Sequence, residues 1–248
     1  MKRQIPNIIT LCNLTCGVIA IIHAVEGHLD LAALWMLLGI AFDFCDGLAA
    51  RLLHVASPLG KELDSLADVV TSGVVPGIIL LSVFNDAIDG IEPRYAVCSY
   101  IALLVPAFSA YRLAKFNLDT RQSHSFLGLP VPSNAIVWAA IGACFCNSSL
   151  CEFAIIPTTG IVDFLTDNYI GLFILLAIEL SGCVLMVSEV PLFALKFKSL
   201  GWKENKTRYI FLLGAMLLIM LFGVLGLAFT IAWYIILSLL SRKTSQND

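Results

Sequence analysis

The chain has 248 residues, of which 59% are hydrophobic and 13% are charged, and its mean hydropathy is +0.90. This composition excludes an ordinary water-soluble domain and predicts an all-α, polytopic integral membrane protein with a bundle of helices. The formal net charge is −3, and no basic patch is interleaved with aromatic residues, which excludes nucleic acid as an expected partner.

Long apolar runs separated by polar segments mark the expected helices. The uncharged run 209–240 has 32 residues. One helix of that length would measure about 48 Å against a hydrocarbon core of about 30 Å, so two short helices with a turn at 223–226 fit better. The prediction is therefore about eight transmembrane helices. In chain order they cover about residues 7–25, 31–53, 60–84 with a kink at Pro76, 95–115, 130–146, 169–189 and the two halves of 209–240.

The connections between these helices differ in character. Residues 116–128 form a polar loop, and 148–168 are mixed enough to be a re-entrant or interfacial segment. Residues 196–208 form a basic loop that we expect to mark topology and to touch anionic lipid. We expect one membrane-embedded domain over residues 1–248, with a catalytic core of about 1–190 and an extra C-terminal helical hairpin at about 207–242.

Basic residues are distributed unequally between the two sides of this arrangement. With eight spans and a cytoplasmic N-terminus, 14 of the 15 Lys and Arg fall inside, and only Arg94 falls outside. Both termini are therefore expected in the cytoplasm. No small-residue cleavage site follows the first apolar run, so we expect a retained first helix. The inside residues are Lys2, Arg3, Arg51, Lys61, Arg112, Lys115, Arg121, Lys196, Lys198, Lys203, Lys206, Arg208, Arg242 and Lys243.

Four carboxylates lie among apolar residues where the second span ends and the third begins. Asp43 and Asp46 are three residues apart, and Asp64 and Asp68 are four apart, so each pair shares one helix face. Buried like charges repel each other and lose hydration, which is costly unless cations neutralise them. Two such faces turned toward each other would form a cage of oxygen ligands, which suits a hard divalent metal.

The residues around the acids add a second kind of chemistry. Gly47 leaves the helix backbone open to a bulky group, and Arg51 can hold phosphate through paired hydrogen bonds. Ser57 can donate a hydrogen bond, and Gly60 begins a helix whose free N–H groups suit an anion. Together these residues indicate a diphosphate bridged by divalent cations, with Asp68 placed to accept a proton.

This stretch resembles the signature of the CDP-alcohol phosphotransferase family, D-x2-D-G-x2-A-R-x8-G-x3-D-x3-D. Every defined position is met, which makes the resemblance specific, although the signature spans only 26 residues. The matching residues are Asp43, Asp46, Gly47, Ala50, Arg51, Gly60, Asp64 and Asp68.

The resemblance implies that an alcohol displaces CMP from a CDP-linked lipid. It implies that Asp43, Asp46 and Asp64 bind two divalent cations, Mg2+ or Mn2+, and that Asp68 completes the site and is the catalytic base. Gly47, Arg51 and Ser57 would contact the CDP group. It further implies a homodimer. The distribution of Lys and Arg places the acidic stretch near the cytoplasmic surface, so we expect the active site of a prokaryotic (inner) membrane protein to face the cytoplasm.

The acceptor alcohol is indicated by weaker patterns. Residues 5–14, 64–76, 112–117 and 126–130 are similar to the bacterial and archaeal phosphatidylserine synthases of the family. That similarity implies CDP-diacylglycerol and L-serine as substrates. The alternatives are sister enzymes that use glycerol 3-phosphate or inositol phosphate. Basic side chains could hold either the carboxylate of serine or the phosphate of the alternative acceptors. The candidate acceptor-binding residues are Arg112, Lys115 and Asn117.

Several candidate site residues could have a structural role instead of a role in binding. Asn7, Thr10 and Asn13, at the cytoplasmic end of the first helix, either contact the CDP-lipid or cap and bridge helices. Arg112 and Lys115 also fit a topology signal, and Asn117 and residues 128–130 fit loop geometry. Glu179 has no evident partner. A cation transporter or channel would also place carboxylates in membrane helices, but it leaves the glycine and arginine of the motif unexplained.

Overall fold

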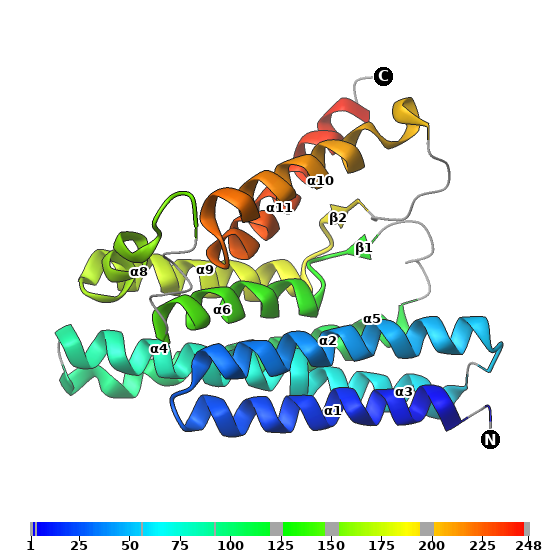
Figure 1. Ribbon diagram of the computed structural model, residues 1–248, viewed down its shortest axis with the longest axis horizontal. Coiled ribbons are helices and arrows are strands. Elements are labelled where there is room, and N and C mark those ends of the chain that lie inside the picture. The colour runs from blue at the N-terminus through cyan, green and yellow to red at the C-terminus, as the bar shows by residue number, and fades with distance from the viewer. Residues whose placement is uncertain are drawn as a thin grey trace.

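The computed structural model describes residues 4–55, 57–91, 93–119, 126–146, 154–193 and 201–245, together with residue 2. Nearly all of these residues are helical, as predicted, and most of the helices run along one long axis (Figure 1). Parts of three predicted connections, at 120–125, 147–153 and 194–200, lie outside the described residues.

The first three rods of the bundle come from the N-terminal part of the chain. α1 (Gln4–Val25) turns at Gly27 into α2 (Leu29–Leu52), and the two helices pack along their length. The third rod is continuous but has three parts, namely α3 (Pro58–Asp68), the π-helical η1 (Val69–Val74) and α4 (Val75–Ile91).

The expected irregularity at Pro76 takes the form of this π-helical segment. Proline has no N–H and its ring crowds the preceding turn, so the hydrogen-bond register must change before it. The segment lies against α1 and α2 with very little space. A Cβ on Gly17 would lie 2.5 Å from Thr71 Oγ1, and one on Gly39 would lie 2.6 Å from Thr71 Cγ2. Glycine at these two positions therefore permits the close approach of three helices immediately beyond Asp68.

The middle of the bundle continues the chain to residue 192. The 3-10 helix η2 (Pro93–Leu103) leads into α5 (Leu104–Leu118), and then come β1 (Phe126–Leu127), α6 (Val131–Cys146), α8 (Thr159–Thr166), α9 (Tyr169–Val187) and β2 (Pro191–Leu192). β1 and β2 pair antiparallel, with Leu127 opposite Pro191. The short helix α8 lies within residues 148–168, the connection for which a re-entrant or interfacial segment is predicted.

The last two helices form a hairpin on one side of the bundle (Figure 1). α10 (Trp202–Phe222) and α11 (Leu225–Ser245) meet at Gly223, which has a φ of +58°, so the turn predicted at 223–226 is confirmed. The basic loop predicted at 196–208 is wrong over its second part, because α10 already begins at Trp202. Only Asn205 in this helix departs from helical geometry, with a φ of −119°.

Six helical segments of the described chain are long and apolar enough to cross a membrane. Two shorter apolar segments, Val131–Cys146 and Leu225–Ser241, would be needed to reach eight, so the count of eight stays a prediction. The six segments are Gln4–Val25, Leu29–Leu52, Pro58–Ile88, Val97–Leu118, Tyr169–Val187 and Asn205–Phe222. The chain is thus a helical, polytopic membrane protein.

Candidate functional site

Three of the four acidic side chains converge between α2 and α3. One carboxylate oxygen from each of Asp43, Asp64 and Asp68 lies within 4.8 Å of the others. Asp68 is buried, and the other two are partly buried. Oδ1 of Asp64 is enclosed and has no hydrogen-bond partner within the described part of the chain. An enclosed group of oxygen donors with an unsatisfied atom fits a hard divalent cation, which would compensate the mutual repulsion of the acids.

The fourth acid, Asp46, lies outside this trio and is held by α1. Its Oδ2 accepts a hydrogen bond of 2.5 Å from Thr10 Oγ1, and Oγ1 also lies 3.0 Å from the carbonyl of Pro6. Both side chains are buried. The sequence motif alone therefore does not describe how Asp46 is oriented, because its partner lies on another helix.

A second polar residue of α1 supports Asp68. Asn13 Nδ2 donates to Asp68 Oδ1 over 3.2 Å, and the Asn13 carbonyl accepts from Thr71 Oγ1 over 3.2 Å. Asn13 is fully buried, and no described residue forms a hydrogen bond with its Oδ1. The π-helical segment and α1 thus both contribute to the position of the acid that ends the motif.

A hollow opens beside the acids between α1, α2 and α3. Gly47 has open space where a side chain would begin, since a Cβ there would meet no atom within 4 Å. We call this space the nucleotide hollow, because four of the residues expected to contact the CDP-lipid line it, namely Asn7, Thr10, Gly47 and Ser57. Arg51 and Asn13, which were expected with them, are not among its lining residues. Its lining residues are Pro6, Asn7, Thr10, Asp46, Gly47, Ala50, Val55, Ser57, Gly60, Lys61 and Asp64.

Two of the expected CDP contacts also have local structural roles. Ser57 is the N-cap of α3, and its Oγ accepts from the N–H of Gly60 over 3.0 Å. Arg51 is exposed, and its Nε donates to the carbonyl of Gly47 one turn earlier in α2. The sequence assigns Lys61 only to the cytoplasmic side of the membrane, but Lys61 also lines the hollow. Its position next to Gly60 of the motif could have indicated this.

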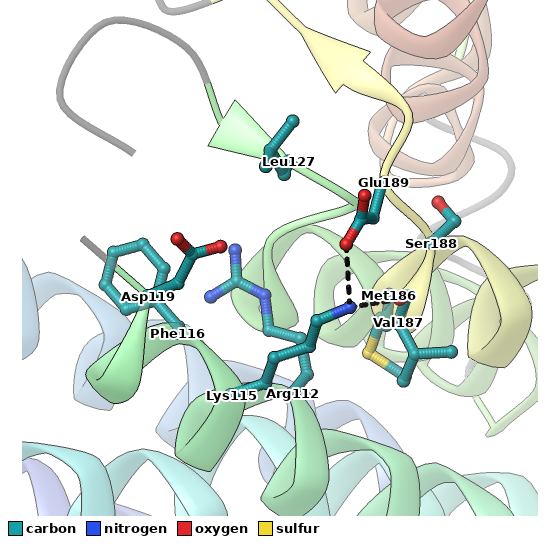
Figure 2. A pocket seen from close by; sticks show the side chains of 9 residues that line it. All are labelled: Arg112, Lys115, Phe116, Asp119, Leu127, Met186, Val187, Ser188 and Glu189. Carbon is teal, nitrogen blue, oxygen red and sulfur yellow. Dashed lines mark hydrogen bonds and ion pairs between the residues drawn. The ribbon is translucent and has the colours of Figure 1, made fainter. Parts of the chain in front are cut away.

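The candidate acceptor residues do not all meet in one place. Arg112 and Lys115 line a second hollow, between the ends of α5 and α9, which we call the acceptor hollow (Figure 2). Asn117 does not line it. The Asn117 Nδ2 instead donates to Ser65 Oγ over 2.7 Å, and its carbonyl accepts from Lys61 Nζ over 2.9 Å. Asn117 therefore ties the end of α5 to α3.

The acceptor hollow also contains residues that the sequence did not single out. Asp119, Ser188 and Glu189 are among its lining residues, and all three are distant in the sequence from the acidic motif. Gly128 shapes the end of α9 that borders it. This residue has a φ of +76°, and a Cβ there would lie 2.7 Å from the carbonyl oxygens of both Met186 and Ser188.

Glu179, which the sequence left unassigned, is fully buried in α9. Neither of its carboxylate oxygens has a hydrogen-bond partner among the described residues. It lies outside the residues that line either hollow.

Comparison with known proteins places the acidic site in a family context. The family model described as CDP-alcohol phosphatidyltransferase matches residues 3–180. The chain is 36% identical over 134 residues to a CDP-diacylglycerol–serine O-phosphatidyltransferase of Bacillus subtilis, which covers 52% of this chain and 70% of the relative. It is 31% identical over 195 residues to a protein of the same description from Methanocaldococcus jannaschii, covering 77% and 87% of the two chains.

An archaetidylserine synthase of Methanothermobacter thermautotrophicus is also similar, with 31% identity over 137 residues. The match covers 53% of this chain and 54% of that relative, so this chain spans about half the length of that protein. The hairpin α10–α11 lies beyond the residues that the family model matches.

Proposed function

This chain belongs to the CDP-alcohol phosphatidyltransferase family, and on that premise we propose that it transfers the phosphatidyl group of CDP-diacylglycerol to L-serine. The products are phosphatidylserine and CMP, and the role is phospholipid biosynthesis. The observation that carries this proposal is the convergence of Asp43, Asp64 and Asp68 next to the nucleotide hollow. The descriptions of the relatives support serine as the acceptor.

Two divalent cations, Mg2+ or Mn2+, are proposed to bind at the four acids. Asp43, Asp64 and Asp68 provide converging oxygens, and Asp46 lies beside them with its Oδ2 fixed by Thr10. When bound, the cations would draw negative charge from the diphosphate and stabilise CMP as it leaves.

The nucleotide hollow is proposed to hold the CDP group. The open space at Gly47 lets the diphosphate approach the backbone of α2. Gly60, in the first turn of α3, lines the same space, but its N–H already donates to the Ser57 Oγ. Lys61 adds a positive charge to this lining, and Asn7 adds an amide. The Nε of Arg51 donates to the carbonyl of Gly47, so its two Nη groups are the ones proposed to contact the ligand.

Asp68 is proposed to be the catalytic base. The serine hydroxyl oxygen forms a bond to the phosphorus that carries diacylglycerol, and the bond from that phosphorus to the bridging oxygen of the diphosphate breaks. CMP leaves with the electron pair, and the hydroxyl proton passes to Asp68. Asn13 donates to Oδ1 of Asp68, and because a carboxylate has about four acceptor positions, Asp68 can complete the cation site and also accept the proton.

The proposed setting is a prokaryotic inner membrane with the acids facing the cytoplasm, and a homodimer is proposed with it. The excess of Lys and Arg at one end of the predicted spans supports this orientation. It lets serine and CMP exchange with the aqueous phase, while the acyl chains of the donor stay in the bilayer.

An acceptor panel tests this function. The purified full chain in detergent, with CDP-diacylglycerol and Mg2+ or Mn2+, should release CMP with L-serine and form phosphatidylserine. Glycerol 3-phosphate and inositol phosphate should support little release. Release with one of these instead of serine would show a sister activity. If no alcohol supported CMP release, the proposed enzyme activity would be wrong and cation transport would be favoured. Cation flux into proteoliposomes that contain the purified chain would then test transport.

A further inference from the structure

The acceptor hollow carries two positive and two negative side chains. Arg112 and Lys115 come from α5, Asp119 follows the end of that helix, and Glu189 follows the end of α9. Figure 2 shows the basic groups between the two acids, with Asp119 on one side and Glu189 on the other. The charges of these four side chains sum to zero, which is the charge of an amino-acid zwitterion.

The Arg112 guanidinium provides the place for a carboxylate. Its side chain is only 7% exposed, and it lies 4.8 Å from the centre of the Phe116 ring. Its Nη2 is enclosed and has no hydrogen-bond partner among the residues that the structure describes. α5, which carries Arg112, packs against η1, the segment that directly follows Asp68, so the hollow and the proposed base lie on neighbouring helices. A planar guanidinium with a free donor suits a carboxylate oxygen.

The opposite wall of the hollow favours a positive group. Glu189 Oε1 lies 3.7 Å from Lys115 Nζ, and the same ammonium donates to the carbonyl of Val187 over 3.2 Å. Val187 is the last residue of α9, where the helix dipole is negative. Lys115 is therefore already paired, and its contacts orient the Glu189 carboxylate. That carboxylate can accept several hydrogen bonds at once.

We propose that Glu189 selects an amino-acid acceptor by receiving its ammonium group beside the C-terminus of α9, while Arg112 receives its carboxylate. This inference rests on the proposed function and deepens it. Glu189 is a specificity-determining residue, and Lys115 positions it. A phosphate-bearing acceptor would place its negative charge close to Glu189 and Asp119 and would have no cation to offer them.

Three acceptors separate the two contacts. L-serine has both charged groups, 3-hydroxypropionate lacks the ammonium, and ethanolamine lacks the carboxylate. The purified full chain is assayed with each acceptor, CDP-diacylglycerol and Mn2+, as wild type, Glu189→Gln and Glu189→Asp. Glu26→Gln is the matched control, since Glu26 is an exposed acid at the far end of α1 that pairs with His23.

Glu189→Gln should raise the KM for serine about tenfold or more, the effect of losing one charge-assisted hydrogen bond. Its KM for CDP-diacylglycerol and its use of 3-hydroxypropionate should stay within about twofold of wild type. The preference for serine over 3-hydroxypropionate should therefore fall about tenfold. Glu189→Asp keeps the charge, so its KM for serine should lie between those of wild type and Glu189→Gln. Glu26→Gln should match wild type.

An unchanged serine KM and an unchanged preference in Glu189→Gln would overturn this inference. Because the Glu189 side chain is 59% exposed, the substitution is not expected to unfold the protein. An unchanged KM for CDP-diacylglycerol would show that the donor site is still folded. Failure of the proposed function looks different, because wild type itself would then make no phosphatidylserine from serine.

Discussion

Thr10 on α1 donates a hydrogen bond of 2.5 Å to the Oδ2 of Asp46 on α2, and both side chains are buried. The acceptor is a carboxylate, so this contact belongs to the stronger class of hydrogen bonds. It ties the first helix to an acid of the motif, and it orients that acid before any ligand binds.

Thr10→Val should therefore weaken the site while it keeps the shape of the side chain. Loss of a hydrogen bond to a charged group costs about 1.5–3 kcal/mol, or roughly 10- to 100-fold in kcat/KM. Mn2+ titration of activity should shift to higher concentration as well. Thr15→Val is the control, because Thr15 is exposed on the same helix and donates only to the carbonyl of Leu11. Equal activity of the two variants would contradict a role for the Thr10 contact.

Asp64→Asn should abolish turnover through lost cation binding. Asp64 contributes an oxygen to the converging trio, and its Oδ1 has no other partner to retain. EDTA should likewise remove activity from wild type, and added Mn2+ or Mg2+ should restore it. Activity that persists after EDTA and dialysis would exclude a cation-dependent reaction at these acids.

Asp68→Asn should separate binding from chemistry. The amide is close in shape to the carboxylate, and its oxygen can still accept from Asn13, but it cannot take a proton from the acceptor. We expect a loss of about 10²- to 10⁴-fold in kcat, with CDP-diacylglycerol binding retained. Equilibrium binding of CDP-diacylglycerol in detergent, measured beside CMP release, checks both parts. Turnover near the wild-type rate would remove Asp68 as the base.

Two glycine substitutions should affect different properties, one the binding of CDP-diacylglycerol and the other the stability of the fold. Gly47→Ala adds a methyl group to open space in the nucleotide hollow, so it should leave thermal stability unchanged and raise the KM for CDP-diacylglycerol. Gly17→Ala would bring Cβ within 2.5 Å of Thr71 Oγ1, so it should lower the melting temperature in detergent. Overpacking of this kind costs about 1–3 kcal/mol. The reverse pattern would show that Gly47 is structural.

The acidic motif could be predicted from the sequence because it depends on helical spacing. Offsets of three and four residues put Asp43 with Asp46 and Asp64 with Asp68, and a Ser-Pro break between the pairs lets the two helices meet. The polar residues of α1 were also identified, but the sequence could not distinguish a ligand contact from the bridges that Thr10 and Asn13 make.

Other parts depended on contacts between distant segments. Pro76 marks an irregularity near this point, but the packing of Thr71 in the π-helical segment against glycines of two other helices depends on residues that are distant in the sequence. The position of Glu189 beside Lys115 follows from the end of α9 meeting α5, across 74 residues. The second part of the basic loop became helix because polar residues at the start of α10 still satisfy helical hydrogen bonding.

Gly128 will be misread in any mutational scan that scores growth or activity alone. A side chain there would collide with the carbonyl oxygens of Met186 and Ser188 and would push away the end of α9, along with the wall that carries Glu189. Every substitution at this position should look like the loss of a substrate contact, although the glycine does not line the hollow. Protein abundance, scored in parallel, would separate such a scaffold position from residues that meet the acceptor.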